Sequence, residues 1–324
     1  MENNATHGFY TDFDKFSLEA KLGWLFVSTF VITVNIIAMT VLRRTKKIPY
    51  APKLLCTGIL CFDMNFLIFA SVRKFIWDPT TNLAFQVVGD VSCHLSLHCV
   101  LLMSIERFLL FYYPMRYLNI ATKKRTRVLI FSSWAFYICL FACVRFGICY
   151  IKLRSMSALK QADSCRDIVT IYFAILLIIL ALTSSVCNWK ILRLVQSKMY
   201  HNSRISLSSK DALRRYYKST GFVLTNLILM ILTATAYGTI IIAVRFYGLS
   251  IHKLRIFVES VSITNCLVIP MLYIMWFKEC QMEVLKMLAV FNKMLHLKAE
   301  KMRIELFDIV VSERFVSRKH SQCH

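Results

Sequence analysis

Seven long apolar stretches, separated by connections rich in lysine and arginine, constrain this 324-residue chain more than any other feature. A helix rises 1.5 Å per residue, so roughly 20 residues cross the hydrocarbon core of a bilayer with every backbone hydrogen bond satisfied. We expect such helices at Leu22 to Leu42, Pro52 to Val72, Leu83 to Tyr113, Val128 to Ile151, Ile168 to Leu194, Ser219 to Val244 and Leu254 to Phe277. The sequence therefore predicts an all-α membrane protein, a seven-transmembrane helix bundle.

The composition agrees with a membrane protein and argues against a nucleic-acid binder. Hydrophobic residues make up 57% of the chain, and a share this high exceeds that of ordinary soluble domains. The formal net charge of +22 would suit a nucleic-acid partner if the basic residues formed one solvent-facing surface. They lie mainly between the apolar stretches instead, as they do in the cytoplasmic loops of multispanning proteins.

The distribution of basic residues predicts the orientation of the chain in the plasma membrane. Positive charge concentrates in alternate connections and in the segment after the last apolar stretch: 43–47, 116–127, 190–218 and 278–303. By the positive-inside rule, this places the N-terminus outside and the C-terminus in the cytosol. The sequon Asn4-Ala5-Thr6 then falls outside, where Asn4 is expected to be glycosylated.

These observations divide the chain into an extracellular segment (1–21), the seven-transmembrane domain (22–277), an amphipathic helix on the inner leaflet (278–297) and a cytoplasmic tail (298–324). In the third segment, apolar residues recur at helical spacing opposite two lysines, a pattern typical of helices that lie on anionic membranes. These apolar residues are Val284, Met287, Leu288, Phe291 and Leu295. Cys280, at its start, is a candidate for palmitoylation.

Five short motifs stand in a fixed order on the expected helices: Asn35, Asp63, Glu106-Arg107-Phe108, Trp134 and Pro270-Met271-Leu272-Tyr273. With seven spans and an outside N-terminus, this order resembles the rhodopsin-like (class A) G protein-coupled receptors. The resemblance extends from about Leu22 to Leu297. It implies a receptor that binds a ligand in the outer half of the bundle and activates a heterotrimeric G protein.

The resemblance also assigns roles to residues. It implies that Glu106 and Arg107, with Pro270 and Tyr273, form the switch that couples to the G protein. It implies a second group in the middle of the bundle, a central polar cluster that consists of Asn35, Asp63 and Asn265. The alternative for the Glu-Arg pair is a stop-transfer flank, and the alternative for Asp63 is a protonated, hydrogen-bonded structural residue.

The departures from the family pattern are informative. Phe108 replaces the usual Tyr, Ile269 replaces the Asn before Pro270, and the fifth and sixth apolar stretches contain no proline. Together with Pro114-Met115-Arg116-Tyr117, these features look most like odorant-receptor-like chemosensory branches. Asn82 and Leu83 stand where the family's helix-three cysteine is expected, so Cys165 either pairs with Cys149 or stays free.

Candidate ligand-binding residues are polar groups at the outer depth of the apolar stretches. Asp90, Cys93 and His94 share one face of a helix, and three residues on the last two spans lie at comparable depth. These three are Tyr237, Glu259 and Ser262. The sharper interpretation is a pocket in which Asp90 or Glu259 meets a polar or cationic ligand; the other is hydrogen bonding between helices.

Other classes of protein fit the sequence less well. His94 and His98 have the i, i+4 spacing of a metal pair, but no third ligand follows, so we expect no metal and no cofactor. The chain has no HExxH, Ser/His/Asp grouping or glycine-rich phosphate loop, which argues against an enzyme. With 8 glycines and few prolines in the spans, it lacks the broken helices of secondary transporters. Receptors of the same class for a peptide or a lipid remain an alternative to a chemosensory receptor.

Overall fold

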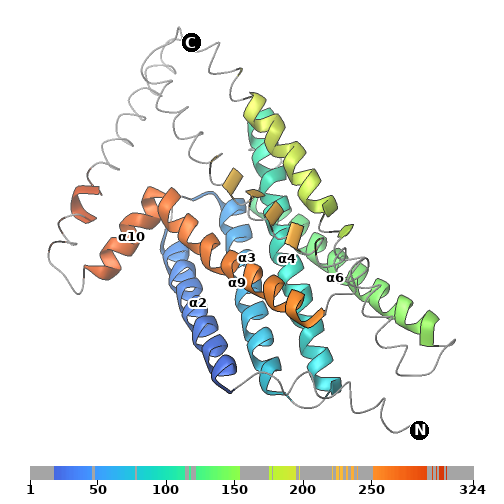
Figure 1. Ribbon diagram of the computed structural model, residues 1–324. Helices are drawn as coiled ribbons and strands as arrows, with labels where there is room; N and C mark the ends of the chain where they lie inside the picture. The colour runs from blue at the N-terminus through green and yellow to red at the C-terminus, as the bar shows by residue number, and fades with distance from the viewer. Residues whose placement is uncertain are drawn as a thin grey trace, which may run out of the picture.

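The computed structural model describes five long α-helices, one shorter α-helix and one 3-10 helix in detail (Figure 1). Residues 18–45, 48–76, 79–113, 117, 122–153, 178–194 and 251–289 are described, together with isolated helical positions at 175–176, 197, 221–239 and 294–304. All the elements found in this part of the chain are helices: α2 (Leu18–Arg44), α3 (Tyr50–Val72), η1 (Arg73–Phe75), α4 (Pro79–Tyr112), α6 (Lys123–Leu153), α9 (Ile251–Trp276) and α10 (Lys278–Leu288).

The long helices confirm five of the seven expected stretches to within five residues at each end. Four of them are long and apolar enough to cross a membrane, over Leu18–Arg44, Tyr50–Phe75, Ala84–Leu110 and Lys123–Val144, and a shorter apolar helix covers Glu259–Leu272. Residues 178–194, from the expected fifth span, are helical, while most of the expected sixth span lies outside the described residues. Several apolar helices in one chain indicate a multi-pass membrane protein.

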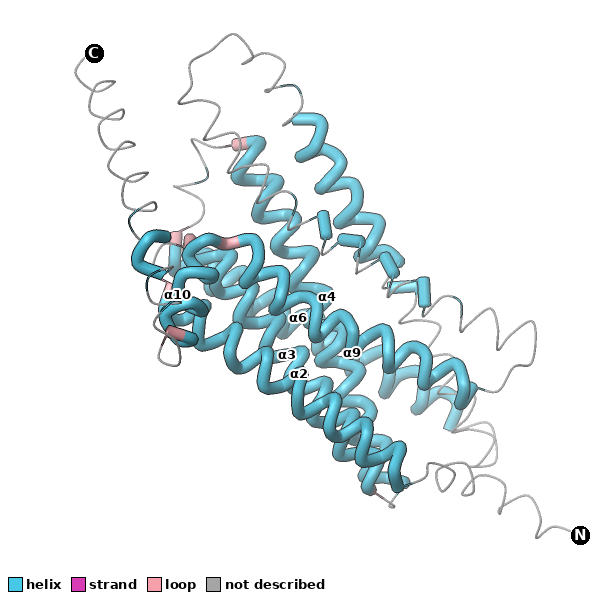
Figure 2. The backbone as a smooth tube through the Cα atoms, turned by 60° about the vertical axis from the view of Figure 1, so that its left-hand side comes forward, coloured by secondary structure: helices cyan, strands magenta, loops and turns pink. Residues whose placement is uncertain are grey.

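Helix α3 forms the centre of the described bundle. It packs against α2, α4, α6 and α9, and Figure 2 shows these helices running side by side. Leu55, Ile59, Leu60 and Leu67 of α3 are at most 2% exposed and lie in one continuous apolar core with residues of α2, α4 and α9. Helix α6 is peripheral, because only 17% of its apolar window is buried, compared with 67% for α4.

The two ends of the bundle differ in their polar contacts, and we name each after its most distinctive feature. At the α10 end, α2 ends, α3 and α6 begin, and α10 packs against α2 and α9. There, Lys53 Nζ of α3 donates to the carbonyl oxygens of Arg43 (3.1 Å) and Thr45 (2.8 Å), which α2 leaves unpaired at its C-terminus. At the Glu259 end, η1 follows α3 and contacts α9 through side chains.

Helix α10 follows α9 after a single residue and docks on the bundle. Cys280 is 1% exposed, and Val284 and Met287 pack against the main core, whereas Leu288 is 45% exposed. Part of the expected apolar face of this helix therefore packs on α2 and α9. That the rest lies on the inner leaflet stays a prediction.

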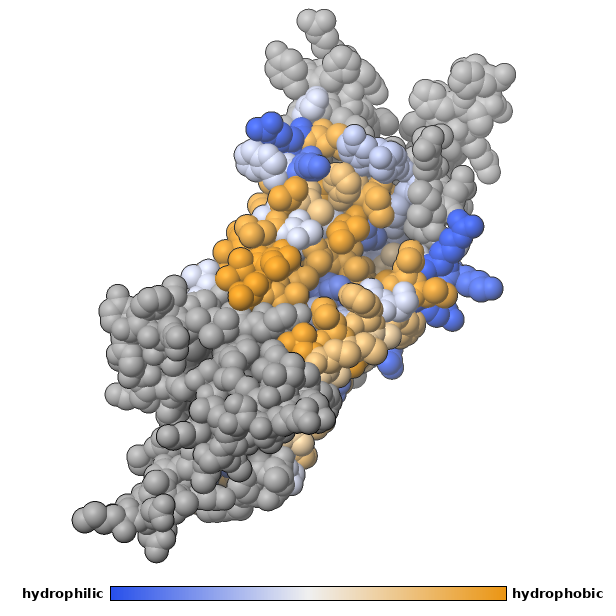
Figure 3. Space-filling view, turned by 90° about the vertical axis from the view of Figure 1, so that its right-hand side faces the viewer, coloured by the Kyte–Doolittle hydropathy of each residue, from blue (hydrophilic) through white to orange (hydrophobic). Residues whose placement is uncertain are grey.

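The surface of the described residues is suited to lipid contact. In Figure 3, hydrophobic side chains cover most of the described area, and hydrophilic ones gather near its edges. Exposed apolar residues are frequent on α2 and α6, for example Phe26 at 76% and Phe136 at 70%. In water such a surface would drive aggregation, whereas in a bilayer it needs no partner.

Candidate functional site

The Glu-Arg pair lies near the last turn of α4, at the α10 end of the bundle. Arg107 is 8% exposed, and its Nε lies 3.4 Å from Oε2 of Glu106. The hydroxyl of Tyr117 donates a hydrogen bond to the other carboxylate oxygen, Oε1. Burial, with the negative charge of Glu106, raises the pKa of the Tyr117 phenol, so Tyr117 stays a donor at neutral pH. One carboxylate thus holds both a cation and a phenol.

An open cavity of about 510 Å³ lies at the end of α4, and Phe108, the residue after this pair, is part of its lining. Its lining combines aromatic residues from the end of α4 with basic residues from the helical segment 178–194: Phe108, Tyr112, Tyr113, Lys190, Arg193 and Leu194. Asn188 fixes this segment to α4, because its Nδ2 donates to Ser104 Oγ at 3.2 Å within the interior. The cavity is therefore bounded by two helices that a buried polar contact joins.

A second polar group lies in the middle of the bundle, where α2, α3, α4 and α9 meet. Pro270 lacks the N–H that would bond to the Cys266 carbonyl one turn earlier in α9. Asn35 of α2, which is fully buried, supplies the missing donor, with Nδ2 3.0 Å from that carbonyl oxygen. Asp63 of α3 is 4% exposed, and its carboxyl faces Ser96 of α4 and the Cys266 thiol.

The structure thus brings together two of the three residues expected in the central polar cluster around Cys266. Asn265, the third, is also buried on α9. A buried polar group without a hydrogen-bond partner is costly. These side chains lie away from water, so their partners must come from neighbouring helices. The group joins α2, α3, α4 and α9 and makes their relative positions interdependent.

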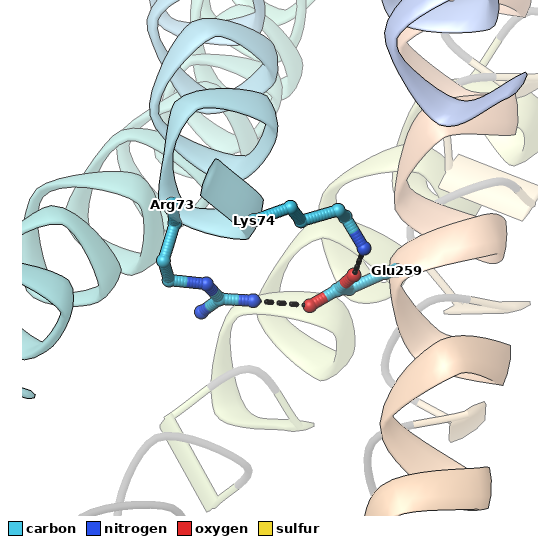
Figure 4. Close-up of polar contacts among 3 residues, drawn as sticks. All are labelled: Arg73, Lys74 and Glu259. Carbon is cyan, nitrogen blue, oxygen red and sulfur yellow. Dashed lines mark hydrogen bonds and ion pairs between the residues drawn. The ribbon is translucent and has the colours of Figure 1, made fainter. Parts of the chain in front are cut away.

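A cluster of opposite charges closes the Glu259 end (Figure 4). Arg73 Nη2 lies 2.5 Å from Oε1 of Glu259, and Lys74 Nζ lies 3.0 Å from Oε2. The three side chains are only 8 to 12% exposed. Lys74 Nζ also lies 3.7 Å from the centroid of the Trp24 ring on α2. The cluster therefore ties η1 to α9 and α2.

This cluster changes the expectation for Glu259. Its carboxylate is engaged by two cations from the same chain, so a cationic ligand would have to displace them. Ser262, one turn further along α9, is 3% exposed. Both residues face the inside of the bundle, as expected for a pocket or for interhelical contacts, and the structure favours the interhelical interpretation for Glu259.

The three residues expected on one face of α4, Asp90, Cys93 and His94, lie on that helix but differ in burial. Asp90 is partly exposed, whereas Cys93 and His94 are 8% and 2% exposed. The His94 ring meets the Phe141 ring of α6 edge-on, with centroids 6.4 Å apart. His98, one turn further, stacks on Tyr137 of α6 at 5.1 Å. The two histidines thus contact α6 through their rings, and no metal-binding group of three ligands occurs in the described part of the chain.

Several expected residues lie outside the described part of the structure. They are Asn4, Tyr237 and Cys165, together with the side chains of Cys149 and Tyr273. Pro270 is described and buried within α9. The roles predicted for the others stay predictions.

Cys280 is less accessible than palmitoylation requires. Its side chain is buried, with Sγ 3.9 Å from Thr45 Oγ1 of α2. Burial raises the pKa of its thiol to about 11. A thiol must reach the membrane surface and be deprotonated to be acylated, so Cys280 is shielded while α10 is docked.

The sequence motifs did not indicate several of the residues that lie around Glu106, Asp63 and Glu259 or that join the cavity walls. These residues are Trp24, Arg73, Lys74, Ser96, Ser104, Tyr117 and Asn188. Arg73 and Lys74 stand beside a connection and look like solvated loop charges in the sequence. The signal that could have found them is Glu259, a carboxylate in an apolar helix that requires a cationic partner.

Comparison with known proteins adds no relative. No protein-family model matches the chain, and no curated protein sequence matches it significantly. The resemblance to rhodopsin-like receptors therefore stays an expectation from the motif residues.

Proposed function

We propose that this protein is a G protein-coupled receptor of the rhodopsin-like class. In this proposal the N-terminus is extracellular, the Glu259 end faces the cell exterior, and the α10 end faces the cytosol. A small molecule binds in the outer half of the bundle, and the departures from the family pattern favour a chemosensory, odorant-like ligand. A class A receptor for a peptide or lipid is the alternative.

The observation that carries the proposal is the arrangement of Arg107. A guanidinium remains charged at all physiological pH values, so its burial at 8% exposure is tolerable only with compensating contacts. Its described ion-pair partner is the adjacent Glu106, at 3.4 Å. A cation held locally by its neighbour can be released without unfolding any helix, which is a property expected of a switch and not of a stop-transfer flank.

The cavity at the end of α4 supports coupling to a partner at this end. Its aromatic walls offer apolar contact, and Lys190 and Arg193 offer positive charge. An amphipathic helix with acidic groups would complement this lining. A helix presented by the G protein therefore enters between the end of α4 and the segment 178–194.

Polar contacts between helices provide a route by which ligand binding can affect the α10 end of the bundle. Helix α9 is joined to η1 through Glu259 and to α2 through the Asn35 bond. A ligand that binds near Asp90 or Ser262 and prefers one arrangement of α9 shifts the population toward that arrangement. Because two cations of the same chain already engage Glu259, Asp90 and Ser262 stay the candidates to contact the ligand in this proposal.

Guanine-nucleotide exchange on a heterotrimeric G protein tests the proposal directly. The full chain in nanodiscs should accelerate exchange either constitutively or with an active ligand found by screening with a promiscuous G protein. Substrate flux across vesicles would support a transporter instead, and turnover of a small molecule would support an enzyme. Absence of exchange across a panel of G-protein classes, with folded protein, would contradict the proposal.

The orientation has its own test. An epitope tag on the N-terminus should bind antibody on intact cells, whereas a tag in the connection 190–218 should require permeabilisation. If the N-terminal tag is accessible only after permeabilisation, the assignment of the two ends is reversed.

A further inference from the structure

The start of α6 carries a group of basic side chains that the receptor mechanism does not use. Lys123, Lys124 and Arg127 are exposed, and none of them forms an ion pair with an acid in the part of the chain that the structure describes. They lie within the first five residues of α6, at the α10 end of the bundle, with Arg125 between them. Within the described residues, three cations without an acidic partner are thus concentrated at one corner of the bundle.

Arg127 is held in position by the neighbouring helix. Its Nε donates to the hydroxyl of Tyr50, the first residue of α3, at 3.0 Å, and its guanidinium carbon lies 5.8 Å from the centre of that ring. The bond uses only one of the guanidinium's five donors, so the terminal nitrogens remain available. An anion that binds here meets a cation that has already lost much of its conformational freedom.

An apolar face begins immediately after this basic corner. Val128, Leu129 and Phe131 are 60%, 63% and 49% exposed. Farther along α6, the helix packs closely against α3, where Trp134 lies against Gly58. A ligand that matches both features has a strongly anionic head and long apolar tails, which is the chemistry of an anionic phospholipid.

We propose that Lys123, Lys124 and Arg127, with Tyr50, form a binding site for a phosphoinositide headgroup, whose acyl chains lie along the exposed face of α6. Three clustered cations match a headgroup with several phosphate groups better than the single charge of phosphatidylserine. The site depends on the orientation proposed above, because it requires the α10 end to face the inner leaflet. It does not depend on G-protein coupling.

Retention of lipid by the purified full chain tests the site. The chain is reconstituted in phosphatidylcholine nanodiscs with a few per cent of phosphatidylinositol bisphosphate, released into detergent, and its bound lipids are counted by native mass spectrometry. Wild type should retain one phosphatidylinositol bisphosphate molecule. Lys123→Gln/Lys124→Gln should weaken binding about 25-fold, because each lost charge near a membrane surface reduces affinity about fivefold.

The chain offers a charge-matched control on the same end of the bundle. Arg43→Gln/Arg44→Gln also removes two exposed cations, at the end of α2, a helix that packs chiefly against α3 and α9. This variant should bind within about twofold of wild type. Equal losses in the two double variants would overturn the proposal, since they would indicate only a general surface charge.

Two further measurements separate the headgroup from other sources of binding. Phosphatidylserine at matched total charge should be retained much less than the bisphosphate lipid, and equal retention would overturn the headgroup assignment. A soluble inositol phosphate should bind at least tenfold more weakly than the lipid. Equal binding would show that the apolar face contributes nothing and would overturn the assignment to a lipid.

Discussion

Asn35 on α2 supplies the hydrogen bond that Pro270 removes from α9. The imide nitrogen of Pro270 has no hydrogen, so the Cys266 carbonyl four residues earlier loses its helical donor. Asn35 Nδ2 lies 3.0 Å from that oxygen and also donates to its own helix at Val31, at 2.9 Å. Asn35 and Pro270 are 235 positions apart in the sequence, yet the side chain of one replaces the backbone hydrogen bond that the other removes.

A double-mutant cycle tests this relationship. Asn35→Ala should lower the free energy of unfolding by about 1–3 kcal/mol, because it leaves the buried Cys266 carbonyl unpaired. In a Pro270→Ala background, residue 270 regains its N–H, so the same Asn35 substitution should cost at least about 1 kcal/mol less. Thermal unfolding of the four proteins in detergent measures both effects. If the losses of stability in the two single variants simply add up in the double variant, Asn35 does not replace the hydrogen bond that Pro270 removes.

The contact between α3 and α6 depends on the absence of a side chain at Gly58. A Cβ placed there would lie 2.8 Å from Cζ2 of Trp134, closer than real contacts allow, and 3.4 Å from Cys99 Sγ. Gly58→Ala should therefore destabilise the protein by about 1–3 kcal/mol, in spite of the better helix propensity of alanine. Trp134→Phe should relieve part of this cost by vacating the position of the larger ring.

Gly23 provides the matched control for this prediction. It lies in α2, and a Cβ at this position meets nothing within 4 Å. Gly23→Ala should be neutral or stabilising by up to about 1 kcal/mol. If both alanine variants unfold at the same temperature, steric contact with Trp134 does not determine the packing of α3 and α6.

The Glu259 cluster should be non-additive in stability. Glu259→Gln leaves two cations without this partner at positions that are about 10% exposed, which should cost about 3 kcal/mol. Arg73→Gln should cost about as much, but the double variant should cost clearly less than the sum of the two, since it removes both members of the 2.5 Å pair. Lys74→Gln, which retains the Arg73 contact, should cost least. Melting temperatures of the purified variants provide the comparison.

Hydropathy was sufficient to predict the long helices, because lipid imposes both their length and their composition. The family resemblance singled out Asn35 and Asp63, and depth along the last apolar stretch singled out Glu259, either for a ligand or for hydrogen bonding between helices. Neither signal identified the partners of these residues. The rotation of each helix about its axis determines whether Arg73 and Lys74 reach Glu259, and no periodicity within one helix encodes its rotation relative to another.

The same limit applies at the other end of the bundle. The amphipathic pattern after residue 277 predicted a helix, but not that Cys280 would pack on Thr45, because docking depends on the angle at which α10 leaves α9. Tyr117 follows the α4 helix by a few residues, and only the path of the chain brings its hydroxyl back to Glu106. Contacts between elements therefore had to come from the structure.

The pH dependence of Cys280 alkylation should reveal its burial. The folded thiol has a pKa of about 11 against an ordinary value of 9.0, so the neutral form is favoured by folding. This contribution to stability is fully present below pH 9 and is lost as the pH rises from 9 to 11. At neutral pH, the thiolate should be about 100-fold scarcer than in the unfolded chain, which slows alkylation accordingly.

Peptide mapping by mass spectrometry isolates this cysteine from the others. The alkylation rate of the Cys280 peptide should show its inflection near pH 11 in the folded protein and near pH 9 in denaturant. Loss of the Thr45 contact in Thr45→Val should not lower the inflection, because that contact works against burial. An inflection near pH 9 in the folded protein would show that α10 undocks and leaves Cys280 open to acylation.

Glu106 and Arg107 provide the decisive test of the receptor mechanism. Arg107→Ala should abolish nucleotide exchange on the G protein while ligand binding is retained, because Arg107 is at the α10 end and the expected ligand residues are at the other. Glu106→Gln removes the charge that holds Arg107, a contact of about 1–3 kcal/mol, so basal exchange should rise about tenfold. Tyr117→Phe removes only the hydrogen bond to Glu106 and should raise it less.

A purely topological role for the pair predicts a different pattern. The substitutions would then lower the amount of protein inserted in the membrane and leave exchange per inserted molecule unchanged. Basal and stimulated exchange, normalised to surface protein, separates the two roles, because it removes the effect of insertion. If Arg107→Ala couples as well as wild type after this correction, the buried guanidinium is not the element that opens toward a G protein, and its local pairing with Glu106 serves only to anchor the end of α4.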